Sequence, residues 1–262
     1  MAGPLYTPKK YEEYQAADEK ALLEHFTKVI GWNANLHSRA SFDFMMDART
    51  FAKDKIILDA GAGYKVCEPF FSNAKKYLSV EHPSGIAMKG MEKFQYDFVA
   101  ELDGELFAPP ESIDEIFSIS VLEHIERPER FFRNCFNLLK PHGRIYMHCP
   151  FIYHEHETPY DFNRFTRYGL RSRLEEAGLK ILRLDPSSSG FYGASAFLSL
   201  AITEEGAARG RSFDTFRLQN GQETPLLPLL NHVISEIEKQ FDDAVYDTTM
   251  PIGWLCVAEK IA

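Results

Sequence analysis

Residues Lys55 to Gly63 read Lys-Ile-Ile-Leu-Asp-Ala-Gly-Ala-Gly, and they predict how the rest of the chain is arranged. The apolar run from Ile56 to Leu58 is long enough for a buried parallel strand. It ends in an acid and then in two glycines, whose backbone can approach a ligand closely because glycine has no Cβ atom. In open parallel sheets, ligands bind at the carboxyl ends of strands. This stretch therefore predicts an α/β fold with a ligand site after its first strand.

The overall composition is that of an acidic globular protein. The chain has 262 residues, of which 45% are hydrophobic, and this is enough for one large α/β domain. The formal net charge is -9 and Lys and Arg form no dense cluster, so we expect no nucleic-acid partner. The N-terminus lacks a signal-peptide pattern, and the most apolar later stretch, 191–202, is too short to span a bilayer. We expect a cytoplasmic protein without an integral membrane segment.

Strand-like and helix-like patterns alternate along the chain. After the first strand, further strands are predicted at 76–80, 97–100, 112–122, 144–148, 179–184 and 252–257. Helical patterns are found at 9–29, 33–51, 86–94, 128–139, 167–177, 191–205 and 226–241. Strands that alternate with helices form βαβ units with right-handed crossovers, which favours a doubly wound, Rossmann-like sheet.

The same pattern predicts a single domain over residues 1–262 with four parts. These are an N-terminal helical cap (1–54), a Rossmann-like core (55–190), a helical insertion (191–248) and a closing strand (249–262). The polar connector at 209–224 is interpreted as a surface loop rather than a lid. The insertion would cover the substrate side of the sheet or form a homodimer contact.

Acidic residues follow several of the predicted strands. Glu81 ends the second strand, about 20 residues after the glycine turn, where an acid can bind the two ribose hydroxyls of a nucleotide. Asp103 follows the third strand, and Glu123-His124 follows the fourth. Because ligands of such sheets bind at the carboxyl ends of the strands, Glu81 indicates a nucleotide-type cofactor site.

The order of these signals resembles the class I S-adenosylmethionine-dependent methyltransferases, in particular the small-molecule enzymes called type 11. The matching pieces are Leu58-Asp59-Ala60-Gly61-Ala62-Gly63, Glu81, Asp103, Ile113-Asp114-Glu115-Ile116, Val121-Leu122-Glu123-His124 and Leu138-Leu139-Lys140-Pro141-His142-Gly143. The resemblance covers about residues 55 to 185. It implies S-adenosylmethionine as the cofactor and a seven-stranded sheet in the order 3-2-1-4-5-7-6, with an antiparallel last strand.

The resemblance also implies which residues bind the cofactor. Asp59 and the backbone from Ala60 through Gly61 to Gly63 would hold its methionine part. Glu81 would bind the ribose and Asp103 the adenine amine, and the fourth strand would contribute Ser118. The family turn commonly carries a third glycine, whereas this chain continues with Tyr64-Lys65. The turn near the methionine part could then be less open than in the family.

The loop from Cys149 to Thr166 is rich in histidine and aromatic residues. It resembles the Pro-x-x-x-x-x-His-x-x-Pro-x-Asp-x-x-Arg-x-Thr loop of a branch that modifies glycans and other polar cell-surface precursors. The matching residues are Pro150, His156, Pro159, Asp161, Arg164 and Thr166. This narrower resemblance implies a small polar acceptor, preferably a hydroxyl of a sugar or glycan precursor.

The same loop supplies the candidate catalytic residues. A base is needed if the acceptor is a hydroxyl, and His156 is the first choice, with His124 and His154 as alternatives. Asp161 would orient His156 or the substrate. Arg164 would bind a substrate carboxylate or phosphate, or would pair with Asp161, and the i, i+3 spacing also suits a pair that only braces the loop.

Three other interpretations remain. The His154-Glu155-His156-Glu157 run, with His148 nearby, could suggest a metal site, but spacing fixes no third and fourth ligand, so no metal is expected. A nicotinamide enzyme is disfavoured because G-x-G-x-x-G is absent and the only Tyr-x-x-x-Lys, Tyr6 to Lys10, precedes every predicted strand. A protein that binds the cofactor without transferring the methyl group is the third alternative, because the third glycine is missing.

Overall fold

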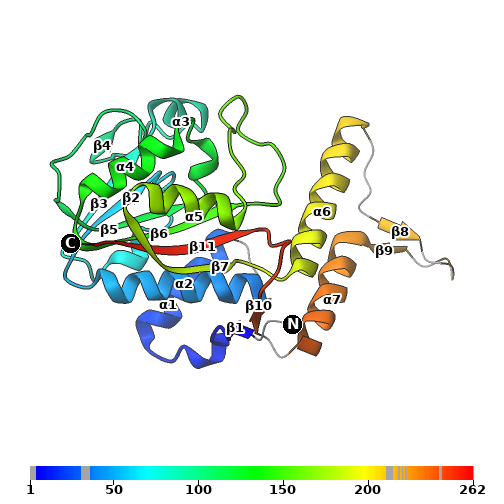
Figure 1. Ribbon diagram of the computed structural model, residues 1–262. Coiled ribbons are helices and arrows are strands. Elements are labelled where there is room, and N and C mark those ends of the chain that lie inside the picture. Colours follow the sequence, from blue (N-terminus) through cyan, green and yellow to red (C-terminus); the bar gives the residue numbers. More distant parts are fainter. Residues whose placement is uncertain are drawn as a thin grey trace.

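The computed structural model describes residues 4–30, 36–210, 215–217, 219, 221, 223–241 and 244–261. A seven-stranded sheet with the order β4-β3-β2-β5-β6-β11-β7 lies at its centre (Figure 1). Its strands are β2 (Ile56–Ala60), β3 (Lys76–Glu81), β4 (Phe98–Val99), β5 (Ile113–Ile119), β6 (Leu139–Pro150), β7 (Leu179–Pro186) and β11 (Gly253–Lys260). Strand β11 is antiparallel to both of its neighbours. The predicted α/β class, strand order and antiparallel last strand are confirmed.

Helices cover both faces of this sheet. They are α1 (Ala17–Ile30), α2 (Leu36–Ala52), α3 (Pro83–Met88), α4 (Pro128–Leu138), α5 (Arg167–Glu176), α6 (Gly190–Ala208) and α7 (Leu226–Glu238). Short 3-10 turns form η1 (Tyr11–Glu13), η2 (Glu68–Phe71), η3 (Leu122–His124) and η4 (Lys239–Phe241). Figure 1 shows α4 and α5 on one face and the blue helices α1 and α2 on the other.

Two hydrophobic clusters follow from the period of two along the strands. Ile116 on β5 and Met147 on β6 pack into the cluster under α4 and α5. Their chain neighbours Phe117 and Tyr146 point the opposite way, into the cluster under α1 and α2. Successive side chains of a strand face opposite sides, so a sheet buried on both faces needs continuous apolar strands. This arrangement leaves the strand ends as the place for polar residues.

Local signals explain several boundaries. Pro128 occupies the first turn of α4, and the Thr166 side chain caps α5 by accepting a hydrogen bond from the Gly169 N–H at 3.1 Å. Strand β6 begins at Leu139, earlier than the expected 144, and includes Pro141. A register shift opposite Ile113 accommodates this start, so the proline ends the helix without preventing the strand.

The segment between β7 and β11 projects away from the sheet. It lies at the right of Figure 1 and contains α6, α7 and a small hairpin of β8 (Thr215–Arg217) and β9 (Glu223–Pro225). The hairpin occupies part of the connector expected to be a loop, and residues 211–214 of that connector lie outside the described residues. Strand β1 (Pro4–Tyr6) pairs with β10 (Val245–Tyr246), a contact that the sequence patterns did not predict.

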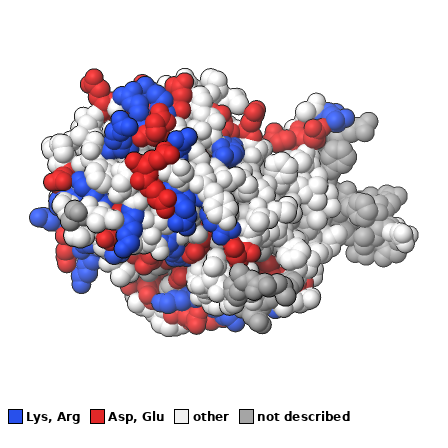
Figure 2. Space-filling view, viewed as in Figure 1, with Lys and Arg blue, Asp and Glu red and all other residues white. Residues whose placement is uncertain are grey.

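The surface in Figure 2 carries interspersed acidic and basic side chains over the sheet, without a patch of one sign on this face. The part over α6 is mostly uncharged, and Phe197 and Leu198 of that helix are exposed.

Within the described residues, no helix is both long and apolar enough to span a membrane.

Candidate active site

The turn after β2 presents bare backbone to a cavity. Gly61 and Gly63 have φ angles of 80° and 51°, a region that residues with a Cβ rarely adopt. A Cβ atom at Gly61 would lie 2.4 Å from Val121 Cγ2, whereas one at Gly63 would meet nothing within 4 Å. The turn is therefore open beside Gly63 although no third glycine follows. Tyr64 is half exposed, and its hydroxyl donates to the Lys89 carbonyl oxygen at 2.9 Å.

Two acids flank this turn. Asp59 at the end of β2 is buried, and its Oδ2 accepts a hydrogen bond from the Tyr77 hydroxyl at 2.5 Å. Burial raises the pKa of Asp59 to about 7. Glu81 at the end of β3 accepts a hydrogen bond from the Gly63 N–H at 2.7 Å and one from the His82 N–H at 2.8 Å. The Glu81 carboxylate is thus fixed beside the glycine turn.

Of the two remaining predicted cofactor residues, Asp103 lines a cavity and Ser118 does not. Asp103 follows β4, and its Oδ2 accepts from the backbone N–H and the Nε of Arg127 at 3.1 and 3.0 Å. The carboxylate lines a cavity together with Glu81. Ser118, by contrast, is buried inside β5 and lines neither of the cavities described below. Its predicted contact with the cofactor has no support in this arrangement.

Two cavities meet at the carboxyl ends of the strands. The smaller has a volume of about 330 Å³, and its lining includes Glu81, Asp103 and His124. The larger has a volume of about 590 Å³, and its lining includes Asp59, Glu123, His148, Tyr153 and His156. The residues that line both cavities are Gly61, Gly63, Lys89 and Ser120. The glycine turn therefore lies at the junction of the two cavities.

This junction fits S-adenosylmethionine in one orientation. The acids Glu81 and Asp103 in the smaller cavity suit the ribose hydroxyls and the adenine amine. The open backbone at Gly63 and the carboxylate of Asp59 suit the methionine part, which carries an ammonium group. The sulfur would then lie at the junction, and its methyl group would face the larger cavity.

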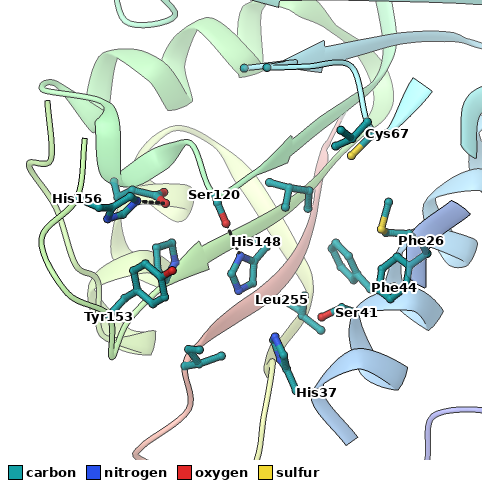
Figure 3. A pocket seen from close by; sticks show the side chains of 18 of the residues that line it. Phe26, His37, Ser41, Phe44, Cys67, Ser120, His148, Tyr153, His156 and Leu255 are labelled. Atoms are coloured by element: carbon teal, nitrogen blue, oxygen red, sulfur yellow. Dashed lines mark hydrogen bonds and ion pairs between the residues drawn. The ribbon is translucent and has the colours of Figure 1, made fainter. Parts of the chain in front are cut away.

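Two predicted catalytic histidines meet beside a carboxylate in the walls of the cavities. The rings of His124 and His156 lie 4.9 Å apart between centroids. Each Nε2 atom is 3.9 Å from Oε1 of Glu123 (Figure 3 shows His156 in this wall). Glu123 is 1% exposed, and neither carboxylate oxygen has a hydrogen-bond partner among the described residues. Burial raises the pKa of Glu123 to about 8.

Glu123 was not among the predicted site residues. It lies shortly after the buried strand β5, and its position next to His124 was the signal available in the sequence. The third partner, His156, comes from the loop after β6. Only the fold brings these residues together.

Asp161 and Arg164 brace the loop that carries His156. The guanidinium of Arg164 donates to both Asp161 oxygens at 2.5 and 2.8 Å and to the His154 carbonyl oxygen at 2.7 Å. Asp161 Oδ2 accepts from the His156 N–H at 2.9 Å and lies 3.3 Å from its Nδ1. Arg164 therefore pairs with Asp161, the second of its predicted roles, and it does not line either cavity.

Two further histidines line the larger cavity (Figure 3) and were not predicted. His148 lies near the end of β6. Its Nδ1 lies 3.1 Å from the Ser120 hydroxyl, and its Nε2 has no hydrogen-bond partner among the described residues. His37, on α2, stacks on Tyr192 of α6 at 4.8 Å. Burial lowers the pKa of His148 to about 3 and that of His37 to about 4, so both rings are neutral. Helices outside the sheet thus complete the cavity.

Comparisons with known proteins concern the type of domain and the fold. Residues 58–147, from β2 into β6, match the family described as "Methyltransferase domain". No curated protein matches the chain. A structural match is a chain of the complex between the Haloferax volcanii Trm112 methyltransferase activator and the putative methyltransferase. It has 15% identity and a TM-score of 0.53, and the match covers 97% of this chain and 96% of that one.

A second structural match is the cyclase SpnF, with 17% identity and a TM-score of 0.50 over 100% of both chains. At such identities the structural matches show the fold, and the family match adds the type of domain. The matched residues begin at Leu58 and include the glycine turn, Glu81, Asp103 and Glu123. Residues 58–147 therefore carry a methyltransferase domain, and the chain is an S-adenosylmethionine-dependent methyltransferase.

Proposed function

We propose that this methyltransferase acts on a hydroxyl group of a small polar acceptor, with a sugar or glycan precursor as the favoured class. The observation that carries the proposal is the group of Glu123, His124 and His156 at the walls of the joined cavities. Transfer to a hydroxyl requires removal of a proton, whereas transfer to a neutral amine does not require a strong base. A buried carboxylate facing two imidazole rings suits the first reaction.

The larger cavity is the proposed acceptor site. S-adenosylmethionine supplies an electrophilic methyl group on a positively charged sulfur. The chain has to align the acceptor oxygen with that methyl group and exclude water. Residues from the sheet, from α2 and from α6 line the cavity, so an acceptor that enters it contacts protein on several sides. A cavity of about 590 Å³ supports transfer to a small molecule rather than to a large folded protein.

His156 is the proposed proton acceptor. Its Nδ1 lies 3.3 Å from Asp161 Oδ2 and 3.2 Å from the His154 carbonyl oxygen. Because both neighbours accept hydrogen bonds, the ring proton resides on Nδ1 and the Nε2 lone pair is left for the substrate. Asp161 stabilises the ring after protonation. His124 has the same Nδ1 arrangement, with the Tyr160 carbonyl at 2.7 Å, but it lines the cofactor cavity.

The lining of the larger cavity supports an acceptor with both polar and apolar faces. Tyr153 and Tyr192 offer aromatic faces, and Ser41 and Ser120 offer hydroxyl groups. Sugar rings present hydroxyls at their edges and apolar C–H groups on their faces, so this mixture suits them. The cavity also includes Phe44 and other apolar residues, which would favour an acceptor with an apolar substituent.

Calorimetry and a methylation assay test the proposal together. S-adenosylmethionine should bind to the wild-type chain, and Glu81→Ala should weaken binding because the ribose loses its acceptor. Radiolabelled methyl groups should appear on hydroxyl acceptors from a panel of sugars and sugar nucleotides. His156→Ala should slow this turnover with cofactor affinity nearly intact, while His142→Ala, at an exposed position on β6, serves as the matched control.

Two results would contradict the proposal. Absence of cofactor binding at millimolar concentration would exclude methyl transfer by this site. Labelling of amines alone would exclude the hydroxyl acceptor. A chain that binds the cofactor without labelling any acceptor in the panel would favour the alternative of a binding protein. The homodimer contact and the cytoplasmic location stay predictions.

A further inference from the structure

We propose that Glu123, His124 and His156 bind a divalent transition-metal cation of the zinc type, which in turn binds the acceptor oxygen. The inference deepens the proposed function and rests on it for the role of the cation. The two histidines and the carboxylate are ligand types that zinc and its neighbours in the first transition series prefer. In the sequence, the histidine pair that suggests a metal is His154 and His156. The fold instead places His156 beside Glu123 and His124.

The spacing of the ligand atoms is close to that of a metal centre. One ligand atom from each residue lies within 4.8 Å of the other two. Each Nε2 is 3.9 Å from Glu123 Oε1. Metal–ligand bonds of about 2.1 Å in a tetrahedral site place ligand atoms about 3.4 Å apart. Small side-chain rotations therefore bring the atoms into coordination distance.

Hydrogen bonds already orient both rings for coordination. His124 Nδ1 lies 2.7 Å from the Tyr160 carbonyl oxygen, and His156 Nδ1 lies 3.3 Å from Asp161 Oδ2. These acceptors place the ring protons on Nδ1 and the lone pairs on Nε2, facing Glu123. Histidine ligands of metals typically donate their other N–H to a carbonyl or carboxylate in this way. The loop bonds of Asp161 thus act as outer support for the site.

Glu123 supplies an independent observation. Its side chain is 1% exposed, and both oxygens lack a hydrogen-bond partner in the part of the chain that the structure describes. An ionised carboxylate without partners is costly to bury, unless it meets a cation. Its pairs with the two histidines exceed hydrogen-bond distance, so they do not satisfy it. A cation between the three side chains would give this buried carboxylate a partner.

The position of the site gives the cation a role in methyl transfer. Glu123 and His156 line the acceptor cavity, and His124 lines the cofactor cavity. Three protein ligands leave a coordination position open for the acceptor oxygen. A second carboxylate, Glu157, lies beside the site: its Oε1 pairs with Lys89 at 2.6 Å, and its Oε2 lies 3.8 Å from His124 Nε2. The cation would orient the hydroxyl and lower its pKa, and the released proton would pass to solvent water. With the cation bound, Nε2 of His156 would be a metal ligand and would no longer be the proton acceptor.

Metal binding can be measured without turnover. The chelator-treated chain is titrated with Zn²⁺ by calorimetry, and with Co²⁺ while its visible absorption is recorded. We expect one ion per chain and a Co²⁺ spectrum of low coordination number. Glu123→Gln should lower the affinity by about a hundredfold or more, since loss of an outer partner alone can cost that much. His142→Ala removes the exposed His142–Glu259 pair, at 3.6 Å, and should change nothing.

Two further measurements distinguish loss of metal binding from loss of the fold. Circular dichroism and cofactor titration show whether Glu123→Gln is folded, and His156→Asn provides a second variant that keeps a similar size. No saturable binding to the wild type at millimolar Zn²⁺, or equal binding to wild type and both variants, would overturn the inference. If the metal-free chain still methylates hydroxyls at the full rate, the inference fails and the proposed function stands. If metal binds but no hydroxyl is methylated, the site stands without its proposed role in transfer.

Discussion

At the scale of single residues, Asp59 combines a structural cost with a predicted binding role. The carboxyl group is buried, and the Tyr77 hydroxyl donates a hydrogen bond to it at 2.5 Å. Burial raises its pKa to about 7, so the group is half protonated near neutral pH before the cofactor arrives. A cationic ammonium group of the cofactor binds better to the ionised form. Cofactor affinity should then depend on pH in the neutral range.

Asp59→Asn tests this dependence. In the wild type, affinity for S-adenosylmethionine should be highest above pH 7 and should fall by up to about tenfold per unit below it, because protonation removes the negative charge. The variant should bind weakly, with a flat pH profile. Calorimetry between pH 5.5 and 8.5, about the range of interest around that pKa, measures both. Superimposable profiles for the two proteins would exclude Asp59 from the ammonium site.

Gly61 and Gly63 differ in what a side chain would meet. Gly61→Ala places a methyl group 2.4 Å from Val121 and also forces φ of 80°, so we expect a loss of about 3 kcal/mol in the free energy of unfolding. Gly63→Ala meets no protein atom, and its strain should cost about 1 kcal/mol. Its methyl group should instead enter the cofactor site and weaken cofactor binding. Urea unfolding should thus show the larger loss of stability in Gly61→Ala, and calorimetry should show the larger loss of cofactor affinity in Gly63→Ala. The same variant being the more impaired in both measurements would refute this.

At the scale of elements, the loop between β6 and α5 forms part of both cavities. Tyr153 and His156 line the acceptor cavity, whereas Glu157, Tyr160 and Phe162 line the cofactor cavity. Arg164 and Asp161 hold the loop in shape, and the N–H of Phe162 donates to the Glu123 carbonyl oxygen at 2.7 Å. The loop therefore behaves as one unit.

Arg164→Leu should release this loop. The variant loses the bonds to Asp161 and to the His154 carbonyl, so both cofactor affinity and turnover should fall, by about tenfold each for a loss near 1.4 kcal/mol. His156→Ala, in contrast, should affect turnover alone. Arg171→Leu is the matched control, since Arg171 pairs with exposed Glu175 at 3.5 Å. A normal cofactor affinity in Arg164→Leu would show that the loop is not braced by this pair.

The elements also show what a sequence can predict. Features that depend on neighbours in the chain were found where the adjacent residues predict them. These are the strand at Ile56, the proline at the start of α4 and the Thr166 cap. The strand order came from the family resemblance, since periodicity does not encode it. The pairing of β1 with β10 joins very short strands distant in sequence, which leave no periodic signal. Glu123 was missed for a similar reason, because its partner His156 belongs to another loop.

At the scale of the whole molecule, one end of the sheet carries the candidate site, and the other carries a buried carboxyl group that affects stability. The candidate site occupies the carboxyl ends of the strands, while Glu115 lies near the opposite end of β5, opposite Ile57 in the register. Glu115 is fully buried, and neither carboxylate oxygen has a hydrogen-bond partner among the described residues. Burial raises its pKa from 4.5 to about 9. A residue placed there affects folding without touching the candidate site.

The raised pKa of Glu115 gives stability a definite pH dependence. The folded state keeps the proton up to about pH 9, whereas the unfolded state releases it above about pH 4.5, so this group lowers stability progressively as pH rises between those values. Glu115→Gln cannot ionise. It should raise the free energy of unfolding by up to about 5 kcal/mol at pH 8 and by almost nothing at pH 4.5. Cofactor affinity should stay unchanged, and Glu105→Gln at an exposed position should have no effect at either pH. Urea unfolding at the two pH values measures the difference, and an equal gain at both would show that ionisation of Glu115 is not its cause.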